Sequence, residues 1–199
     1  MPKVVDHSAR RSEISAVAAK LIARGGLEAA TIREIAANSG YSKGIVEHYF
    51  DNKEELISGA LDWANHSYMA RAEKATQGHR GLAAIRARLE VTLPLTDAIR
   101  NEWKVRLVFW SMAAIQPLLR RRQAARLNST IAYFEQDIDN AKALHEIDPA
   151  TVSAELAKQI LFFVSGISCT ALHNPAVYNK NALLAEIEQL LQRIRRADC

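Results

Sequence analysis

The stretch Thr31–Leu56, TIREIAANSGYSKGIVEHYFDNKEEL, is the most informative part of this 199-residue sequence. It opens with Thr-Ile-Arg-Glu, in which the threonine can cap a helix and the glutamate three residues later can reach back to it. Ser39-Gly40 ends this short helix, and Ser42 can cap a second one that runs through about Phe50. Two short capped helices joined by a glycine-containing turn are the sequence form of a helix-turn-helix.

The second helix of this motif has one face to bury and one to expose. Val46 and Phe50 lie four residues apart and, with Tyr41, are expected to pack inward. In a helix-turn-helix the second helix lies in the major groove of DNA, with its N-terminal residues at base edges. The residues expected to face outward are Lys43, Gly44, Glu47 and His48, and Ile45 and Tyr49 are expected at the margin of this face.

This outward face predicts sequence-specific contacts with DNA. Lys43 can donate to guanine O6 or N7, and Gly44 has no side chain, so the backbone can approach the bases closely. Thr31 and Lys53 lie at predicted helix N-termini, where free backbone N–H groups and the helix dipole favour phosphate. The full set of candidate DNA-binding residues is Thr31, Arg33, Ser42, Lys43, Gly44, Ile45, Glu47, His48, Tyr49 and Lys53.

Helical periodicity dominates the rest of the chain, and no segment alternates like a strand for long. An amphipathic helix precedes the motif and ends at Gly25-Gly26. Asp51-Asn-Lys-Glu54 reads as another capping box that opens a long helix, and Pro149 is expected at the first position of a later one. The prediction is an all-α protein of about nine helices, with further helices near 82–93, 103–115, 117–144, 151–173 and 182–195.

Composition and charge exclude several classes of protein. No run approaches the roughly 18 apolar residues of a membrane span, and residues 1–11 lack the apolar core of a signal peptide, so a cytoplasmic protein without membrane contact is expected.

The net charge of +4 is too small to indicate nucleic-acid binding by itself. Lys and Arg are concentrated in residues 80–126, ten against three acidic residues. The run Arg120–Arg122 fans around its helix, which indicates a solvated face.

No motif in the sequence predicts an enzyme, a metal site or a cofactor. The patterns GxxxxGK[ST], GxGxxG, GxSxG and HExxH do not occur, and the six histidines show no pair at ligand spacing. Cys169 and Cys199 suggest neither a metal cluster nor a disulfide framework. The alternative to a DNA-binding regulator is therefore a helical ligand-binding or scaffold protein without DNA function.

The motif resembles the head of the tetracycline-repressor (TetR) family. The matching residues are Thr31-Ile32, Ile35-Ala36, Gly40, Ser42, Gly44, Tyr49-Phe50, Lys53 and Leu56. The resemblance implies that Thr31, Tyr49 and Lys53 contact phosphates, while Lys43 and Gly44 approach bases and Ile45 contacts a thymine methyl group or a sugar. Glu47 stands where many relatives have tyrosine. It can accept from a cytosine amine or pair with Lys43 away from the DNA, and we favour the second role.

A narrower resemblance, to the choline-responsive repressors of betaine synthesis, extends through the chain. It rests on Met1-Pro2-Lys3, Gly44-Ile45, His48-Tyr49-Phe50 and a later pattern from Trp103 to Arg120. It implies a homodimer that represses a small operon and is released by a small-molecule effector. The expected domains are 8–55, a DNA-binding domain with its motif at 31–50, and 56–199, a ligand-sensing and dimerisation domain.

The effector and the dimer interface are placed in the second domain. Candidate ligand-binding residues are Trp103, Lys104, Phe109, Trp110 and Tyr133. Aromatic faces attract quaternary ammonium ions such as choline, whereas Arg100, Lys104 and Arg106 favour an organic anion, and both alternatives remain open. Residues 160–164 and 183–194 are apolar enough for helices that pack against a second copy. A symmetric dimer suits an approximately palindromic operator with half-sites roughly 34–36 Å, or a multiple of that, apart.

Overall fold

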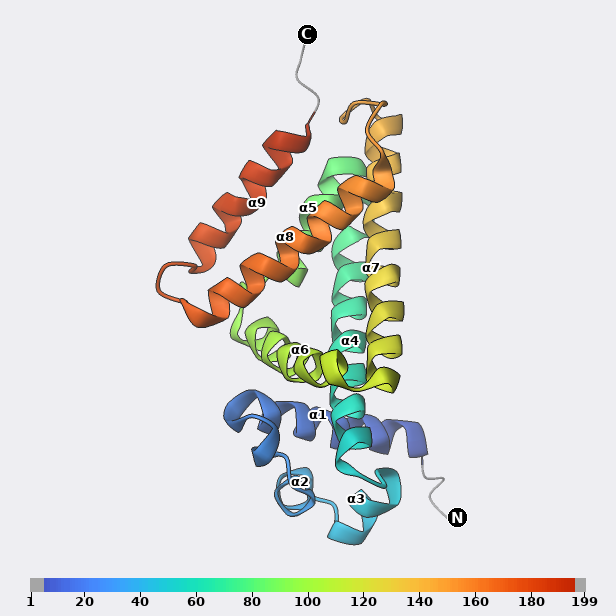
Figure 1. The fold of residues 1–199 in the computed structure, drawn as a ribbon, viewed down its shortest axis with the longest axis vertical. Coiled ribbons are helices and arrows are strands. Elements are labelled where there is room, and N and C mark those ends of the chain that lie inside the picture. Colours follow the sequence, from blue (N-terminus) through green and yellow to red (C-terminus); the bar gives the residue numbers. More distant parts are fainter. Residues whose placement is uncertain (1–5, 196–199) are drawn as a thin grey trace. The chain divides into compact units, whose positions relative to one another are not determined.

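The computed structural model describes residues 6–195, so Met1-Pro2-Lys3 and Cys199 lie outside the described residues. This part of the chain is all-α, as predicted (Figure 1). Its helices are α1 (His7–Gly25), the short 3-10 helix η1 (Leu27–Ala29), α2 (Ile32–Ser39), α3 (Lys43–Tyr49), α4 (Lys53–Thr76), α5 (Gly81–Thr92), α6 (Asp97–Ile115), α7 (Pro117–Ala143), α8 (Ser153–His173) and α9 (Lys180–Ile194).

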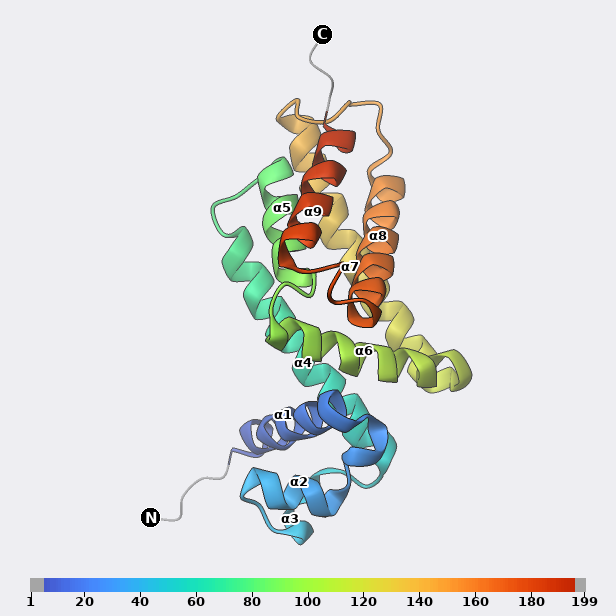
Figure 2. The same cartoon turned by 90° about the vertical axis from the view of Figure 1, so that its left-hand side faces the viewer.

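The described chain divides into two compact units. The first comprises residues 6–67 and 101–112, and the second comprises residues 68–100 and 113–195. Within the first unit α1 packs against η1 and α2, and α2 packs against α3. Both short helices lie on the same side of α1 (Figures 1 and 2). The core of this head contains Ile14, Ile22, Ile35, Val46 and Phe50, each at most 2% exposed.

The caps of the short helices agree with the sequence. Thr31 Oγ1 accepts from the Glu34 N–H at 3.2 Å, and Ser42 Oγ accepts from the Ile45 N–H at 3.3 Å. Gly40 ends α2 with φ +74° and ψ 7°, a left-handed conformation that costs a glycine little. The turn between α2 and α3 is therefore determined by local chemistry.

Three local expectations were wrong. Tyr41 is only half-buried, and its hydroxyl hydrogen-bonds to Glu13. The cap of α4 is Asn52 and not the expected Asp51. Asn52 Oδ1 accepts from the Glu55 N–H at 2.8 Å. Asparagine and aspartate cap helices about equally well, so either residue could take this position. Pro149 lies in a turn, and α8 begins only at Ser153.

The second unit is a bundle of longer helices. α5 packs against α7 and α9, and α7 packs along α8 (Figure 2). Its core contains Ile85, Leu89, Phe134, Ile160 and Ile187, all fully buried. Within residues 6–195, α8 is the one helix long and apolar enough to cross a membrane, with 44% of its most apolar window buried in the protein. The core helix of a bundle meets the same criterion, so this observation does not indicate a membrane protein.

Candidate nucleic-acid interface

One side of α3 is buried, which turns the opposite, outward face toward solvent. Val46 and Phe50 are buried on the inside of the helix, as predicted. Ile45 and Tyr49 are half-buried at the margin. The remaining candidate residues, on α3 and around it, are exposed: Thr31, Arg33, Ser42, Lys43, Gly44, Glu47, His48 and Lys53. Because burial of Val46 and Phe50 determines which side turns outward, the exposed side chains remain available to a partner.

Lys43 and Glu47 form an ion pair along this face. Lys43 Nζ lies 3.3 Å from Glu47 Oε1, and the two side chains are 69% and 51% exposed. The predicted pairing of these residues is therefore present in the free protein. An exposed pair of this kind contributes about 0–1 kcal/mol, so it can be exchanged for a stronger contact.

Gly44 has open space around it. A Cβ built on Gly44 would meet no heavy atom within 4 Å, outside its own stretch of helix backbone. A glycine inside a helix costs roughly 0.5–1 kcal/mol relative to alanine, and nothing in the described fold requires that cost here. The described fold therefore leaves room beside Gly44 for the close approach of a partner.

A groove of about 610 Å³ lies where two helix N-termini meet. Thr31, at the N-cap of α2, lines it together with Asn52 and Lys53 at the start of α4. Exposed backbone N–H groups and aligned helix dipoles make such a place favourable for a phosphate group. Glu47 and Asp51 also line the groove, so its charge is mixed rather than uniformly positive.

Lys53 already has an acidic neighbour. Its Nζ lies 2.9 Å from Glu28 Oε1, and the two side chains are 46% and 87% exposed. Water screens an exposed pair strongly, and a phosphate can replace the carboxylate without leaving a buried charge behind. Glu28 thus holds Lys53 at the edge of the groove, and a phosphate can take the place of Glu28 in this ion pair.

Residues of α1 and α4 pack closely against the C-terminal end of α3. The Arg11 guanidinium donates to the Tyr49 carbonyl oxygen at the end of α3 and lies 4.4 Å from the centre of the Phe50 ring. A Cβ added at Gly59 of α4 would come within 2.7 Å of that ring and 2.8 Å of Ser15 Oγ. This close approach requires a glycine. Neither Arg11 nor Gly59 has a signal in the sequence, because their partners are distant along the chain.

Three aromatic rings, those of His7, His48 and Tyr49, cluster beside the outward face of α3. Tyr49 Oη lies 2.8 Å from His7 Nδ1, and the His48 ring is 5.3 Å from the Tyr49 ring between centroids. The predicted phosphate-binding hydroxyl of Tyr49 therefore has a hydrogen-bond partner on α1. No pattern in the sequence indicates His7 as part of this site, since no spacing links residues that meet only in the folded head.

The candidate effector residues are distributed over both units. Trp103, Lys104, Phe109 and Trp110 are on α6, and Tyr133 is on α7. Trp103 and Phe109 are buried, Trp110 and Tyr133 are half-buried, and Lys104 is exposed. The rings of Trp103 and Trp110 lie 5.7 Å apart in an edge-to-face arrangement, which is a favourable aromatic contact in itself.

The charges that favoured an anionic effector are largely compensated within the chain. Arg106 is 8% exposed, lies 5.2 Å from the Trp103 ring centre, and is 3.9 Å from Glu102. Arg100 contacts Asp97 at 3.5 Å. The arginines at 120–122 are exposed, as a solvated face requires.

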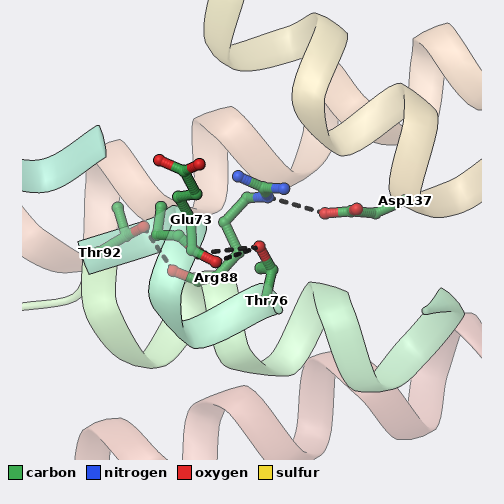
Figure 3. Close-up of polar contacts among 6 residues, drawn as sticks. Glu73, Thr76, Arg88, Thr92 and Asp137 are labelled. Carbon is green, nitrogen blue, oxygen red and sulfur yellow. Dashed lines mark hydrogen bonds and ion pairs between the residues drawn. The ribbon is translucent and has the colours of Figure 1, made fainter. Parts of the chain in front are cut away.

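A buried ion pair joins α5 and α7 in the second unit (Figure 3). Arg88 Nε donates to Asp137 Oδ2 at 2.7 Å, and each side chain is 9% exposed. Figure 3 shows the Arg88 side chain extending from α5 toward Asp137. The guanidinium also lies 5.2 Å from the centre of the Tyr133 ring. Burial opposes the charge of Arg88, but the hydrogen bond and attraction of Asp137 outweigh it and raise its pKa. Tyr133 thus has a cationic neighbour within its own unit.

A capped helix pair with an exposed reading face, held on a third helix, defines the class of helix-turn-helix DNA-binding regulators. Comparison with known proteins supports this class and specifies it. The family "Bacterial regulatory proteins, tetR family" matches residues 14–60, and "BetI-type transcriptional repressor, C-terminal" matches residues 82–196. The chain belongs to the tetR family of bacterial regulatory proteins, with a C-terminal part of the BetI type. It is a helix-turn-helix transcriptional repressor.

Individual relatives cover most of the chain. The transcriptional regulator BetI of Burkholderia thailandensis is 30% identical over 173 residues, 84% of each chain. A transcriptional regulator from Rhodococcus sp. Rha1 has a TM-score of 0.80 at 25% identity, over 95% of this chain and 99% of its own. A putative regulator from Saccharomonospora viridis, solved in complex with choline, has a TM-score of 0.86 at 20% identity, over 96% and 100%. These relatives are regulators rather than enzymes.

Proposed function

We propose that the chain represses transcription as a homodimer, with the outward face of α3 in the major groove of an approximately palindromic operator. The single observation that carries this proposal is the exposed set Lys43, Gly44, Glu47 and His48 on a helix whose opposite side is buried. Residues 8–55 would bind DNA, and residues 56–199 would sense the effector and dimerise.

The roles within the head divide between bases and phosphates. Lys43 and Gly44 would approach base edges, with Ile45 against a thymine methyl group or a sugar. Phosphate oxygens would be held by the residues around the groove and at the margin of α3, namely Thr31, Arg33, Ser42, His48, Tyr49 and Lys53. Glu47 would pair with Lys43 in the free protein and stay off the DNA.

Exposed residues on α8 support the dimer. Phe162 is 68% exposed, although it lies in the middle of an apolar helix. Gly166, one turn later, is also exposed, and a Cβ there would meet nothing within 4 Å. A large apolar side chain next to a small residue on one helix face suits close packing against a second helix. Phe162→Glu should therefore yield monomers by light scattering, whereas Gln77→Glu, at an exposed position after α4, should not.

The effector proposal follows from aromatic side chains and from a structural neighbour. The neighbour from Saccharomonospora viridis was solved with choline bound. Indole faces attract quaternary ammonium ions, and Trp103 and Trp110 already contact one another on α6. Choline is therefore the first candidate, and an organic anion that meets the exposed Lys104 is the second.

A gel-shift titration on promoter DNA tests the DNA-binding function. Binding should weaken steeply as salt is raised, because each phosphate contact releases counterions. Lys53→Ala should weaken operator and random DNA alike and reduce the salt slope by about 1 per head. Binding that is absent, or insensitive to salt, would favour a helical ligand-binding or scaffold protein instead.

Tryptophan fluorescence and operator release test the effector. Trp63→Phe removes the tryptophan outside α6, so the remaining signal comes from Trp103 and Trp110. Choline should change this signal and weaken operator binding through a coupling of about 1–3 kcal/mol. Trp110→Ala should abolish release while DNA binding is retained. If neither choline nor organic anions alter operator affinity, α6 contains no effector site.

A further inference from the structure

We propose that His7 is a proton-linked positioning residue for the DNA backbone: a protonated imidazole frees the Tyr49 hydroxyl hydrogen for a phosphate oxygen. This inference rests on the proposed placement of Tyr49 at a phosphate and adds a regulated state to that contact. It is carried by one hydrogen bond and by the position of the rings around it.

The hydrogen bond joins the first residue of α1 to the last residue of α3. Tyr49 Oη lies 2.8 Å from His7 Nδ1, with 5.8 Å between the ring centroids. Arg11 holds the same tyrosine through its carbonyl oxygen. Two residues of α1 therefore determine where the Tyr49 hydroxyl lies, while the imidazole itself is exposed to solvent.

The direction of this hydrogen bond decides what Tyr49 can do. A tyrosine hydroxyl has one hydrogen to donate and can also accept. When Nδ1 of His7 is unprotonated, it accepts that hydrogen, and none remains for a phosphate. When Nδ1 carries a hydrogen it donates to Tyr49 Oη, and the hydroxyl hydrogen can point toward an anion. An imidazolium always satisfies the second arrangement, whereas a neutral ring does so only in one tautomer.

The charges around His7 come from three helices. Asp6 accepts from the Ala9 and Ser8 N–H groups as the cap of α1, which lowers its pKa and keeps it ionised beside the ring. On α3 the neighbours are His48, 6.4 Å between centroids, and Tyr49. On α4, Asp62 and His66 line a groove together with Ser8 and Arg11 of α1. The other charged or titratable groups on the helices packed here are Asp6, Arg10, Arg11, His48 and Tyr49.

Bound DNA adds a negative phosphate to these groups. A nearby negative charge favours the imidazolium form, so operator binding should take up protons at His7. If the complex binds more protons than the free protein, affinity rises as pH falls. When binding changes the pKa of one group by one unit, the affinity changes by up to about tenfold per head.

Operator affinity measured as a function of pH tests the proposal. The full-length protein is titrated with a duplex selected from random sequence, between about pH 8 and about pH 6, either side of the ordinary imidazole range. Wild type should bind several-fold to about tenfold more tightly per head at the lower pH. His7→Gln and Tyr49→Phe should each remove most of this slope, and the double variant should resemble either single one.

His79→Gln is the matched control. His79 is an exposed histidine just after α4 that is not among the groups around His7, and it has no proposed role in DNA binding. This variant should keep the full slope. NMR titration of the His7 ring should show it holding its proton to higher pH in the complex than in the free protein.

The outcomes separate this inference from the proposed function. A wild-type protein that binds no DNA at any pH overturns both. Binding without a pH slope, or with a slope that survives His7→Gln, overturns the role of His7 and leaves the function intact. A slope lost in His48→Gln and retained in His7→Gln assigns the proton to the neighbouring imidazole and likewise overturns it.

Discussion

Lys43 Nζ and Glu47 Oε1 lie 3.3 Å apart across one turn of α3. The pair neutralises the one lysine on the reading face of the free head. An exposed pair contributes about 0–1 kcal/mol. A good bidentate contact with guanine gives about 1–3 kcal/mol of discrimination. The proposed base contact would be the stronger of the two, so DNA would draw Lys43 away from Glu47 without any rearrangement of the fold.

Glu47→Gln should retain the preferred operator and bind it more tightly. The substitution removes a carboxylate that repels phosphates, and it leaves Lys43 fully charged. Lys43→Ala should cost about 1–3 kcal/mol on the operator and relax specificity at the base it reads. Selection from random oligonucleotides, followed by affinity titration, measures both effects. An altered consensus for Glu47→Gln would show that the carboxylate itself contacts a base.

Gly44→Ala should separate stability from DNA binding. The methyl group has open space within the protein, and alanine favours a helix by roughly 0.5–1 kcal/mol, so the free energy of unfolding should rise. Operator affinity should fall, because the methyl group lies between the helix and the groove. Gly40→Ala is the matched control: at φ +74° it should destabilise the head instead. Unchanged operator affinity in Gly44→Ala would exclude close approach of the backbone at this position.

Asp137→Ala should destabilise the protein strongly. It leaves the buried Arg88 guanidinium without its carboxylate, and breaking a buried pair in this way typically costs about 3–5 kcal/mol. The double variant Arg88→Met/Asp137→Leu should lose much less, since no buried charge remains. Urea unfolding at one fixed protein concentration measures the difference. If the double variant is as unstable as Asp137→Ala, packing at these positions matters more than charge.

Glu188→Gln should destabilise the protein near neutral pH but not in acid. The hydrogen bond from Arg86, at 2.7 Å between Nη2 and Oε2, and its positive charge lower the pKa of Glu188. Stability from this group is present above the ordinary glutamate value and is lost as pH falls through the lowered one. Melting temperatures of the two proteins should therefore differ at about pH 7 and converge toward about pH 3. A constant difference would mean that the carboxylate does not titrate in this range.

The sequence was sufficient to predict local structure in the head. The caps at Thr31 and Ser42, the turn at Gly40 and the inward side of α3 all depend on residues within a few positions of one another. The displaced cap at Asn52 shows the limit of such reasoning: two adjacent residues can both cap, and the helix register chooses between them. The roles of Arg11 and His7 depend on how α1 crosses α3, which no spacing encodes.

The chemistry of the candidate effector residues was harder to predict. Arg100 and Arg106 contribute to a basic segment in the sequence, but Asp97 and Glu102 accompany them one turn away on α6. Counting charges along the chain could not distinguish a cation that binds a ligand from one that is already paired. The aromatic residues pose the same problem, because burial of Trp103 and Phe109 is what a plain core also requires.

The division of α3 into a buried and an exposed side has an evolutionary consequence. Exchanging Lys43, Glu47 or His48 alters side chains that the rest of the protein does not need for folding. Mutation on the exposed side would therefore retarget the regulator to a new promoter after gene duplication, while Val46 and Phe50 keep the core of the head intact. In such a lineage, paralogues should diverge at these exposed positions sooner than at Val46 and Phe50.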